Sequence, residues 1–359
     1  MLDTYGWSDA LQRLFHEHAA RGLIPARVTV QQRGHYGLVI ETGEVVGELS
    51  GRFHFEAEAT GYPVAGDWVA VTPPADEGPV MIQALLPRST SFVRREANGG
   101  RAQVVAANID LALLVASLNA DLNPRRIERY LATAWESGAR PVVVLTKADT
   151  CEDPAPLIEE IKAIAHGVEV HVVSAVTGEG MADLAALLKP GETAVLLGSS
   201  GVGKSTLVNA LAGRELMHTR EIREDDARGR HTTTHRELVL LPSGALVLDT
   251  PGMRELGLWN ADTGLAATFG DLETEVEALA AHCRFRDCGH GAEPGCAVRA
   301  ALESGELDAE RWEAYGKLQR ELAHLDRKES PAAASQARKV WIQREKAMRQ
   351  RAKHRETDE

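Results

Sequence analysis

A glycine-rich segment in the second half of the chain carries the residue types that bind phosphate. It reads Gly198-Ser199-Ser200-Gly201-Val202-Gly203-Lys204-Ser205, between an apolar run at 194–197 and a helical run that begins at Thr206. In such a strand, loop and helix, backbone N–H groups close around phosphate oxygens and the helix N-terminus adds its positive end. Lys204 then reaches the β- and γ-phosphates, Ser205 is suited to hold Mg²⁺, and Thr206 is also expected to be a nucleotide-binding residue. The segment therefore predicts a P-loop that binds a nucleoside triphosphate.

Two further segments are predicted to face the γ-phosphate. Asp249-Thr250-Pro251-Gly252 follows an apolar run at 245–248, and at such a strand end a carboxylate reaches Mg²⁺ through water while a glycine amide reaches the γ-phosphate. Gly229-Arg230-His231-Thr232-Thr233-Thr234-His235 lies between this motif and the P-loop. We interpret it as a switch loop in which one of the three threonines, with Thr233 as the candidate, ligates Mg²⁺ beside the triphosphate. The alternative is a polar surface loop.

The base is predicted from Thr146-Lys147-Ala148-Asp149, which follows an apolar run at 141–145. This tetrapeptide looks like the N-K-x-D element of GTPases, with Thr146 in place of the asparagine. A carboxylate at Asp149 accepts both the ring N–H and the exocyclic amine of guanine, which adenine does not present together, and the Lys147 stem lies along the base. Ser174-Ala175, after the run at 169–173, resembles the S-A element whose backbone touches the guanine oxygen. GTP is therefore the predicted nucleotide.

The order of these elements differs from that of a Ras-like chain, in which the P-loop comes first and the guanine elements come last. Here the guanine elements at 146–149 and 174–175 precede the P-loop at 198–205, which precedes the motif at 249–252. The same strands and loops can assemble around a nucleotide while the chain ends move elsewhere. The order predicts a circularly permuted GTPase, in which the second switch leads directly into the next domain.

Three cysteines and one histidine lie within fourteen residues of one another. They are Cys283, Cys288, His290 and Cys296. Three thiolates and an imidazole are the ligand set of a closed, tetrahedral structural zinc site, and they are too soft for magnesium or calcium. Four protein ligands leave no open position for catalysis, so one structural Zn²⁺ is predicted. The alternative is a set of buried free cysteines, and Cys151, which lies outside the cluster, receives no role.

Apolar periodicity and turn residues divide the chain into four predicted parts. Residues 1–94 combine an amphipathic helix at 8–22 with five short strands that fit a small β-barrel, OB-type or SH3-like. Residues 95–260 alternate strands and helices, which indicates an α/β domain with a parallel sheet. Residues 261–328 are predicted to be a mostly helical zinc-binding domain and 329–359 a basic tail. The expected barrel strands are 27–31, 36–40, 45–49, 67–71 and 80–86.

Two helices have recognisable signals of their own. Asn123 suits the N-cap of one helix, Pro124 its first position and Gly138 the position after its end. In 308–327, apolar side chains recur at spacings of three and four, which indicates core packing rather than a binding surface. These side chains are Trp312, Tyr315, Leu318, Leu322 and Leu325.

The formal charge of the 359 residues is −12, which by itself argues against nucleic-acid binding. The charge is segregated, however: residues 336–355 carry +7 and the rest of the chain −19. RNA contacts are therefore expected at the tail and at Arg88, Arg94, Arg95 and Arg101 rather than over a broad face, with a solvated helix as the alternative for the tail. The 44% hydrophobic content is typical of a globular protein. Without a long apolar run or signal peptide, a cytoplasmic protein is expected.

Together these features resemble the bacterial ribosome small-subunit-dependent GTPase A family. The resemblance rests on the motif order, on residues 229–234 and 249–252, and on the Cys/His cluster with its Glu293-Pro294-Gly295 lead-in. It implies three domains: an N-terminal OB barrel, a permuted P-loop GTPase domain and a C-terminal zinc domain. It also implies a monomeric, slow GTPase that binds the small ribosomal subunit and its rRNA, is stimulated by the subunit late in maturation, and helps other assembly factors to leave.

The resemblance also implies a catalytic role for His231. Ras-like enzymes orient the attacking water with a glutamine just after D-x-x-G, but Met253 occupies that position here. His231 in the switch loop is the implied water-positioning residue, and Lys204 is the second expected catalytic group. Two other functions stay open at this point: a GTP-gated metal chaperone, and a nucleotide-binding scaffold whose hydrolysis is incidental.

Overall fold

The structure is a computed structural model that describes residues 1–32, 34–53, 61–75, 78–95, 102–216, 236–249, 261–291 and 293–329. The chain divides into two compact units. The first comprises Met1–Gly257 and Thr263–Thr268, and the second comprises Leu258–Asp262 and Phe269–Glu359. A barrel and an α/β sheet belong to the first unit, and the Cys/His cluster belongs to the second. Among the described residues, no helix has the length and apolar character needed to cross a membrane.

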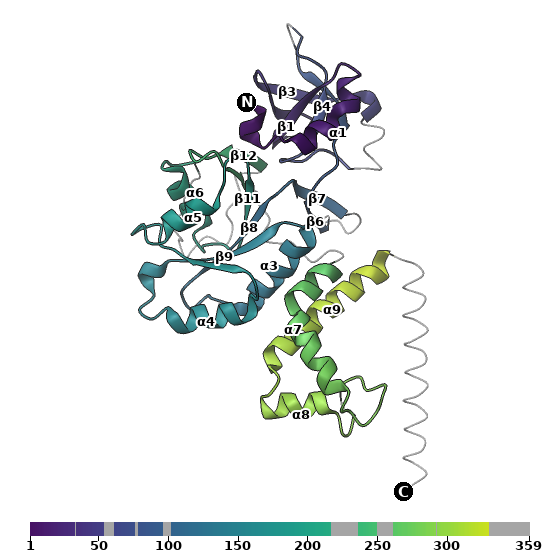
Figure 1. Ribbon diagram of the computed structural model, residues 1–359, viewed down its shortest axis with the longest axis vertical. Coiled ribbons are helices and arrows are strands. Elements are labelled where there is room, and N and C mark those ends of the chain that lie inside the picture. Colours follow the sequence, from purple (N-terminus) through teal and green to yellow (C-terminus); the bar gives the residue numbers. More distant parts are fainter. Residues whose placement is uncertain are drawn as a thin grey trace, which may run out of the picture. The chain divides into compact units, whose positions relative to one another are not determined.

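Five strands near the N-terminus close into a barrel (Figure 1). They are β1 (Ile24–Gln31), β2 (Tyr36–Ile40), β3 (Gly43–Leu49), β4 (Trp68–Val71) and β5 (Val80–Leu85). β1 pairs with β2 and β4, β2 with β3, and β4 with β5, all antiparallel, while β3 and β5 pair in parallel. This is the strand order of an OB barrel. The predicted barrel is confirmed, and of the two barrel types weighed, it is the OB type.

The predicted alternation of strands and helices forms a mostly parallel sheet with the order β10-β9-β8-β11-β13-β12. Its strands are β8 (Leu111–Ser117), β9 (Arg140–Thr146), β10 (Glu169–Val172), β11 (Thr193–Leu197), β12 (Arg236–Leu240) and β13 (Leu246–Asp249). Only β12 runs antiparallel to its neighbours among these described strands. The fold class predicted for this region, an α/β GTPase domain, is confirmed.

Helices cover both faces of this sheet (Figure 1). They are α3 (Pro124–Ser137), α4 (Ala155–Ile164), α5 (Met181–Leu187) and α6 (Lys204–Ala212). Leu114 of β8 packs in one core with α3 and α4, whereas Leu113 packs in another with α5 and α6. Because successive side chains of a strand point to opposite faces, β8 must be apolar on both, as its residues 111–116 are. The signals read at Asn123, Pro124 and Gly138 are the N-cap, first position and C-cap of α3.

Two features of the first unit were not predicted. β6 (Ser91–Arg95) and β7 (Ala102–Ala107) form an antiparallel hairpin. In addition, β12 pairs antiparallel with β1 of the barrel, with Val30 opposite Glu237 and Gln31 opposite Arg236. Sheet and barrel therefore form one hydrogen-bonded array that runs from β10 to β4.

Arg27 of β1 is buried between the barrel and the sheet. Its guanidinium donates to the carbonyls of Tyr5 and Asn108, at 3.0 and 3.2 Å. It also donates to the Thr193 hydroxyl at 3.1 Å and lies 4.8 Å from the centre of the Trp68 ring. Burial lowers the pKa of Arg27 to about 10, so the cation persists at neutral pH and needs these acceptors. The contacts fasten the two parts of the first unit to each other.

Arg88 has a different role from the one that the charge pattern predicts. Its guanidinium makes hydrogen bonds of 2.8 and 2.7 Å to the buried carboxylate of Asp67, and its side chain is 14% exposed. A bidentate pair in this position directs the guanidinium inward. This pairing argues against the RNA contact predicted for Arg88. Arg94 donates to Gln103 across the β6–β7 hairpin at 3.1 Å, and the side chains of Arg95 and Arg101 lie outside the described residues.

The described part of the second unit is helical (Figure 1). Its helices are α7 (Asp262–Ala280), of which Thr263–Thr268 belong to the first unit, α8 (Ala297–Ser304) and α9 (Ala309–Glu329). The rings of Phe269 on α7 and Tyr315 on α9 lie 5.3 Å apart, and Arg311 makes hydrogen bonds of 2.5 and 2.8 Å to Asp271. The apolar face predicted for 308–327 is thus a packing face. Its buried residues are Tyr315, Leu318 and Leu322.

Candidate nucleotide-binding edge and Cys/His cluster

The ends of neighbouring strands bring the predicted nucleotide residues to one edge of the sheet. In the parallel register, Ser117 of β8 lies opposite Thr146 of β9, and Leu114 lies opposite Leu197 of β11. The P-loop continues from β11, the guanine tetrapeptide from β9, and Ser174-Ala175 comes shortly after β10. Carboxyl ends of parallel strands form the crevice in which α/β proteins bind ligands. The three elements therefore share one site, although residues 146 to 205 supply them in permuted order.

The P-loop backbone packs closely against the backbone of β8 at Gly198. A Cβ atom at Gly198 would lie 2.4 Å from the carbonyl oxygen of Val115, so only glycine fits there. Gly203 has a φ of 95° and precedes the first residue of α6, Lys204. The Lys204 Nζ donates to the carbonyls of Gly198 and Ser199 at 2.7 and 2.5 Å. The ammonium is thereby held over the loop, next to the N-terminus of a helix, where an anion is favoured.

Thr146 contacts the P-loop. Its side chain is buried, and its hydroxyl lies 2.6 Å from the carbonyl oxygen of Val202 and 3.1 Å from that of Ala116. A hydroxyl can donate only one proton, and the shorter of the two distances indicates that the Val202 carbonyl accepts it. The threonine that stands in place of the asparagine of N-K-x-D therefore fixes the P-loop. The sequence predicts a nucleotide-site residue here, but not the loop carbonyl that it binds.

Asp149 is oriented by the next element of the site. The Ser174 hydroxyl donates to Oδ1 of Asp149 at 2.5 Å, and Ser174 itself is fully buried. The Ser174 oxygen also accepts from the amides of Val176 and Thr177, at 3.2 and 3.1 Å. Each carboxylate oxygen has two lone pairs, so Asp149 can accept from this serine and from a base together. Ala175, half-buried, adjoins this network, as a backbone contact to the base requires.

The four predicted metal ligands lie together between α7 and α8. Their ligand atoms are all within 4.8 Å of one another. The Sγ atoms of Cys283 and Cys296 are 3.9 Å apart, and His290 Nδ1 lies 3.7 and 3.5 Å from them. Around a tetrahedral ion with metal–sulfur bonds of about 2.3 Å, ligand atoms are about 3.8 Å apart, whereas a disulfide needs about 2.05 Å. The cluster, completed by Cys288, fits a tetrahedral metal ion.

Local hydrogen bonds support this ligand set. The Glu293 carboxylate accepts from the amides of Gly291 and Gly289, at 2.8 and 3.3 Å, on either side of His290. Its hydrogen bonds with its own amide and that of Gly291 lower the pKa of Glu293 below its usual range. The Cys296 sulfur accepts from the Arg299 amide at 3.4 Å and caps the N-terminus of α8. Amide donors to sulfur and a helix N-terminus both favour a thiolate, the form that binds metal.

Comparison with known proteins gives one assignment over nearly the full length. A family model described as RsgA GTPase matches residues 85–259. The small ribosomal subunit biogenesis GTPase RsgA 2 of Listeria monocytogenes is 46% identical over 354 residues, 99% of each chain. The chain belongs to the RsgA GTPase family. An Opitutus terrae member, named small ribosomal subunit biogenesis GTPase RsgA, is likewise 46% identical, over 95% of each chain. As a member of the RsgA family, this protein is a GTPase.

Solved structures confirm the permutation. YjeQ from Thermotoga maritima is 27% identical, with a TM-score of 0.59, and covers 84% of this chain and 98% of its own. YloQ, described as a circularly permuted GTPase, is 24% identical with a TM-score of 0.56, and covers 84% and 95%. The predicted RsgA-type arrangement of OB barrel, permuted GTPase domain and helical region with a Cys/His cluster is therefore the fold found.

Family membership implies Mg²⁺ bound with GTP, and one expected ligand is in a suitable place. Ser205 lies in the first turn of α6, directly after Lys204, and a hydroxyl oxygen is a hard ligand that Mg²⁺ accepts. Of the other predicted Mg²⁺ ligands, Thr233 lies outside the described residues, as does the side chain of Asp249, although its backbone ends β13. His231, Gly252 and residues 330–359 of the basic tail also lie outside the described residues.

One polar contact of the P-loop was missed from the sequence. Arg126, at the start of α3, donates through Nη1 to the Ser199 hydroxyl at 2.6 Å. The signal was indirect: Asn123 and Pro124 place a helix start directly after β8, at the edge where the P-loop also begins. Arg126, in that first turn, thereby reaches the P-loop.

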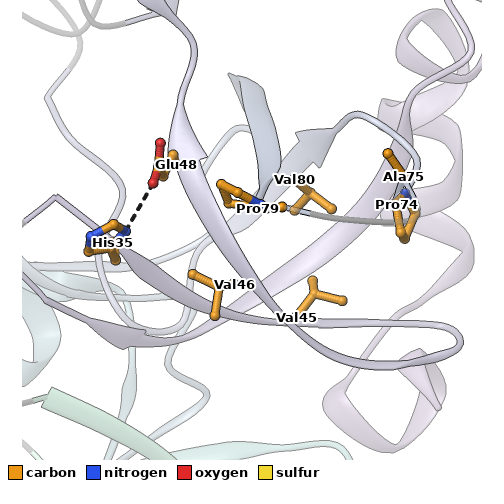
Figure 2. A pocket seen from close by; sticks show the side chains of 9 residues that line it. His35, Val45, Val46, Glu48, Pro74, Ala75, Pro79 and Val80 are labelled. Carbon is orange, nitrogen blue, oxygen red and sulfur yellow. Dashed lines mark ion pairs between the residues drawn. The ribbon is translucent and has the colours of Figure 1, made fainter.

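A cavity in the barrel is separate from this edge. It has a volume of about 480 Å³ and lies between β3 and the residues that lead into β5 (Figure 2). Its walls include Val45, Val46 and Pro79, and His35 pairs with Glu48 at 3.2 Å. None of the predicted nucleotide or metal residues lines it, and a single His–Glu pair among apolar side chains is not a catalytic or metal-binding set.

Proposed function

We propose that this GTPase acts in late maturation of the small ribosomal subunit, binds the subunit and its rRNA, and is stimulated by the subunit. The proposal is carried by the extent of the similarity. Relatives named small ribosomal subunit biogenesis GTPase match up to 99% of the chain, so the likeness includes the barrel and the Cys/His cluster as well as the GTPase motifs. A shared P-loop domain alone would support hydrolysis, but not a common partner.

In this proposal, GTP controls when the protein and other assembly factors leave the subunit. The β1–β12 pairing supports such control, because β12 lies between the predicted switch loop and β13, which ends at Asp249. Rearrangement of either switch on hydrolysis would act on β12, which is hydrogen-bonded to the barrel, directly from the switch loop or through its partner β13. The barrel would then change its fit to the subunit with the state of the nucleotide.

Each predicted residue has a role in binding or hydrolysis. The P-loop amides and Lys204 neutralise the phosphates, while Asp149 selects guanine. Ser205, Thr233 and Asp249 would hold the Mg²⁺, which supplies positive charge at the β- and γ-phosphates. The Gly252 amide would contact the γ-phosphate.

His231 is the proposed residue that orients the attacking water, since Met253 has no group that could do so. An imidazole can accept a hydrogen bond from water and hold it in line. Slow intrinsic turnover follows, because a switch loop that carries His231 must be positioned by the partner before water is aligned.

The Cys/His cluster is proposed to bind one structural Zn²⁺. The sulfurs of Cys283 and Cys296 and the His290 nitrogen, spaced 3.5–3.9 Å apart, suit this ion together with Cys288, whose sulfur lies within 4.8 Å of them. The closed set favours bracing of the helical region over delivery of metal. RNA contacts are proposed for the basic tail and for exposed arginines rather than for a broad charged face of the barrel. The protein is proposed to act as a monomer.

One experiment separates the candidate functions. GTP hydrolysis is measured with the protein alone, with purified small subunits, with large subunits and with added zinc. The proposal expects stimulation by small subunits only. Stimulation by zinc would favour a metal chaperone, and no stimulation would favour a scaffold.

His231→Ala tests the catalytic assignment in the same assay. Loss of a water-orienting group is expected to lower subunit-stimulated hydrolysis by about 100-fold or more, with guanine nucleotide affinity unchanged. Wild-type turnover in this variant would remove His231 from the mechanism.

A further inference from the structure

Arg126 contacts the P-loop from outside the nucleotide motifs. It is the third residue of α3, and its amide donates to the Asn123 side chain at 3.1 Å, which fixes the helix start. β8 and β11 are parallel neighbours, so the loop after β8 and the P-loop after β11 leave the sheet at the same edge. This geometry carries the guanidinium of Arg126 to Ser199.

The contact holds Ser199 from two sides. Arg126 Nη1 donates to the Ser199 hydroxyl at 2.6 Å, while Lys204 Nζ donates to the Ser199 carbonyl at 2.5 Å. Asp121 lies 3.6 Å from the same Nη1 and helps to orient the guanidinium. The separation of 2.6 Å between Arg126 Nη1 and the Ser199 oxygen is that of a direct hydrogen bond.

We propose that Arg126 is a positioning residue for nucleotide binding: through the Ser199 hydroxyl, it holds the P-loop backbone in the conformation that receives the phosphates. A loop with several glycines loses much conformational entropy when it orders. A charge-assisted hydrogen bond that orders the loop before the nucleotide binds reduces the conformational entropy lost on binding. Together, Arg126, Lys204 and Thr146 fix the loop at Ser199, Gly198 and Val202.

This role predicts a specific kinetic pattern. A loop ordered in advance favours bound GTP, bound GDP and the transition state alike, because all three use the same phosphate cradle. Loss of the contact is therefore expected to raise KM for GTP about five- to tenfold with kcat unchanged. An arginine that touched the γ-phosphate in the transition state would instead lower kcat by about 10³-fold or more.

The test is a double-mutant cycle on the full-length protein with Arg126→Ala, Ser199→Ala and the double variant. GTP and GDP affinities are measured by equilibrium titration, and KM and kcat by steady-state hydrolysis. Each single variant is expected to weaken both nucleotides about fivefold, and the double variant no more than either one, because both changes remove one contact. Arg126→Lys, which keeps the charge but not the fork of donors, is expected to restore only part of the affinity.

Arg140→Ala is the matched control. Arg140 also pairs with a carboxylate, Glu169 at 2.9 Å, but it begins β9 at the opposite edge of the sheet. The Arg140→Ala protein is expected to have the same GTP and GDP affinities and the same KM for GTP as the wild type.

Additive losses in the cycle would mean that Arg126 does not act through Ser199, and full rescue by lysine would mean that charge alone matters. A fall in kcat, or no change in either constant, would also overturn the assignment. If Arg126→Ala does not fold, Ser199→Ala and Arg126→Lys still test the proposal. A wild-type KM for GTP in both of these variants would contradict it. The result is independent of any ribosomal role, because it concerns intrinsic GTP binding.

Discussion

The nucleotide edge and the Cys/His cluster are assembled in opposite ways. Hydrogen bonds that shape the edge join residues 25, 56 and 73 positions apart, whereas the four metal ligands lie within fourteen residues. The edge lies on β8 and β11, whose side chains are almost all buried, while the residues around the ligands are mostly exposed. The sheet core therefore stabilises the first site, whereas the second is expected to depend on the metal ion proposed for its ligands.

The largest expected effect follows from removing the metal. Cys288→Ser, or treatment with a strong chelator, is expected to unfold the ligand loop and α8, because structural zinc contributes about 10–16 kcal/mol in small zinc domains. Zinc content by mass spectrometry and far-UV circular dichroism report the loss. GTP affinity is expected to stay within about twofold of the wild type, since the edge belongs to the other unit.

Cys151→Ser is the control for this experiment. Cys151 is a half-buried cysteine outside the cluster, so both zinc content and helicity should be retained. A Cys288→Ser protein with one bound zinc and native helicity would contradict the dependence of the loop on metal. A joint loss of metal and GTP binding would show that the two regions are not independent.

The next largest effect is expected at Asp149. In Asp149→Asn, an amide N–H faces the guanine donors, so one or both of them lose their partner, and GTP affinity should fall by about 100-fold, or about 3 kcal/mol. Xanthosine triphosphate, which carries an oxygen in place of the amine, should bind better than GTP. Titrations of the wild type and of Asp149→Asn with GTP and with xanthosine triphosphate measure this change of nucleotide preference.

Asp153→Asn supplies the comparison for that variant. Asp153 is an exposed acid four residues further on, so its substitution removes the same charge without touching the base site. Equal losses of GTP affinity in the two variants would show that net charge, and not pairing with the base, accounts for the effect.

The sequence predicts the parts of each region whose signals are contiguous. The P-loop, the guanine tetrapeptide and the metal ligands are short runs with fixed spacing, and each lies where the structure brings its residues together. Local signals also define elements: β2 spans the predicted residues, and Asn123 and Gly138 bound α3. Period and capping are properties of neighbouring residues, so one sequence is enough to read them.

The contacts that the sequence does not predict join distant segments. Nothing in the period of residues 24–31 specifies that β1 pairs with β12, about two hundred residues later. Charge alone cannot distinguish Arg88, which binds the buried Asp67, from an arginine that faces solvent. Arg126 and Thr146 likewise reach their P-loop partners only when the sheet is assembled. Such contacts depend on tertiary packing and not on local preference.

Thr146→Val measures one of these long-range contacts. Valine has nearly the same shape but cannot donate to the Val202 carbonyl, and leaving that carbonyl unpaired should cost about 1–3 kcal/mol. A lower midpoint of urea unfolding and weaker GTP binding are both expected, because the same hydroxyl stabilises the fold and the loop. Thr133→Val is the matched control: its hydroxyl donates to the Arg129 carbonyl within α3, which helical bonding also satisfies. Similar losses of stability and GTP affinity in both variants would mean that the hydrogen bond to the P-loop contributes no more than one within a helix.

The smallest effect is expected from a support of the metal loop. In Glu293→Gln, the side-chain amide keeps one oxygen that can accept from Gly291 or Gly289, so the turn around His290 is weakened but not released. Supports of this kind contribute about 10–100-fold to metal affinity when they bind a ligand directly. Glu293 binds backbone on either side of the ligand, so a loss nearer to threefold is expected, measured by competition with a chromophoric chelator. Glu303→Gln, which removes an exposed ion pair with Arg299 on α8, should leave zinc affinity unchanged. A loss of 100-fold or more in Glu293→Gln would mean that the cluster is held by its surroundings as firmly as the nucleotide edge is, and the contrast between the two regions would then fail.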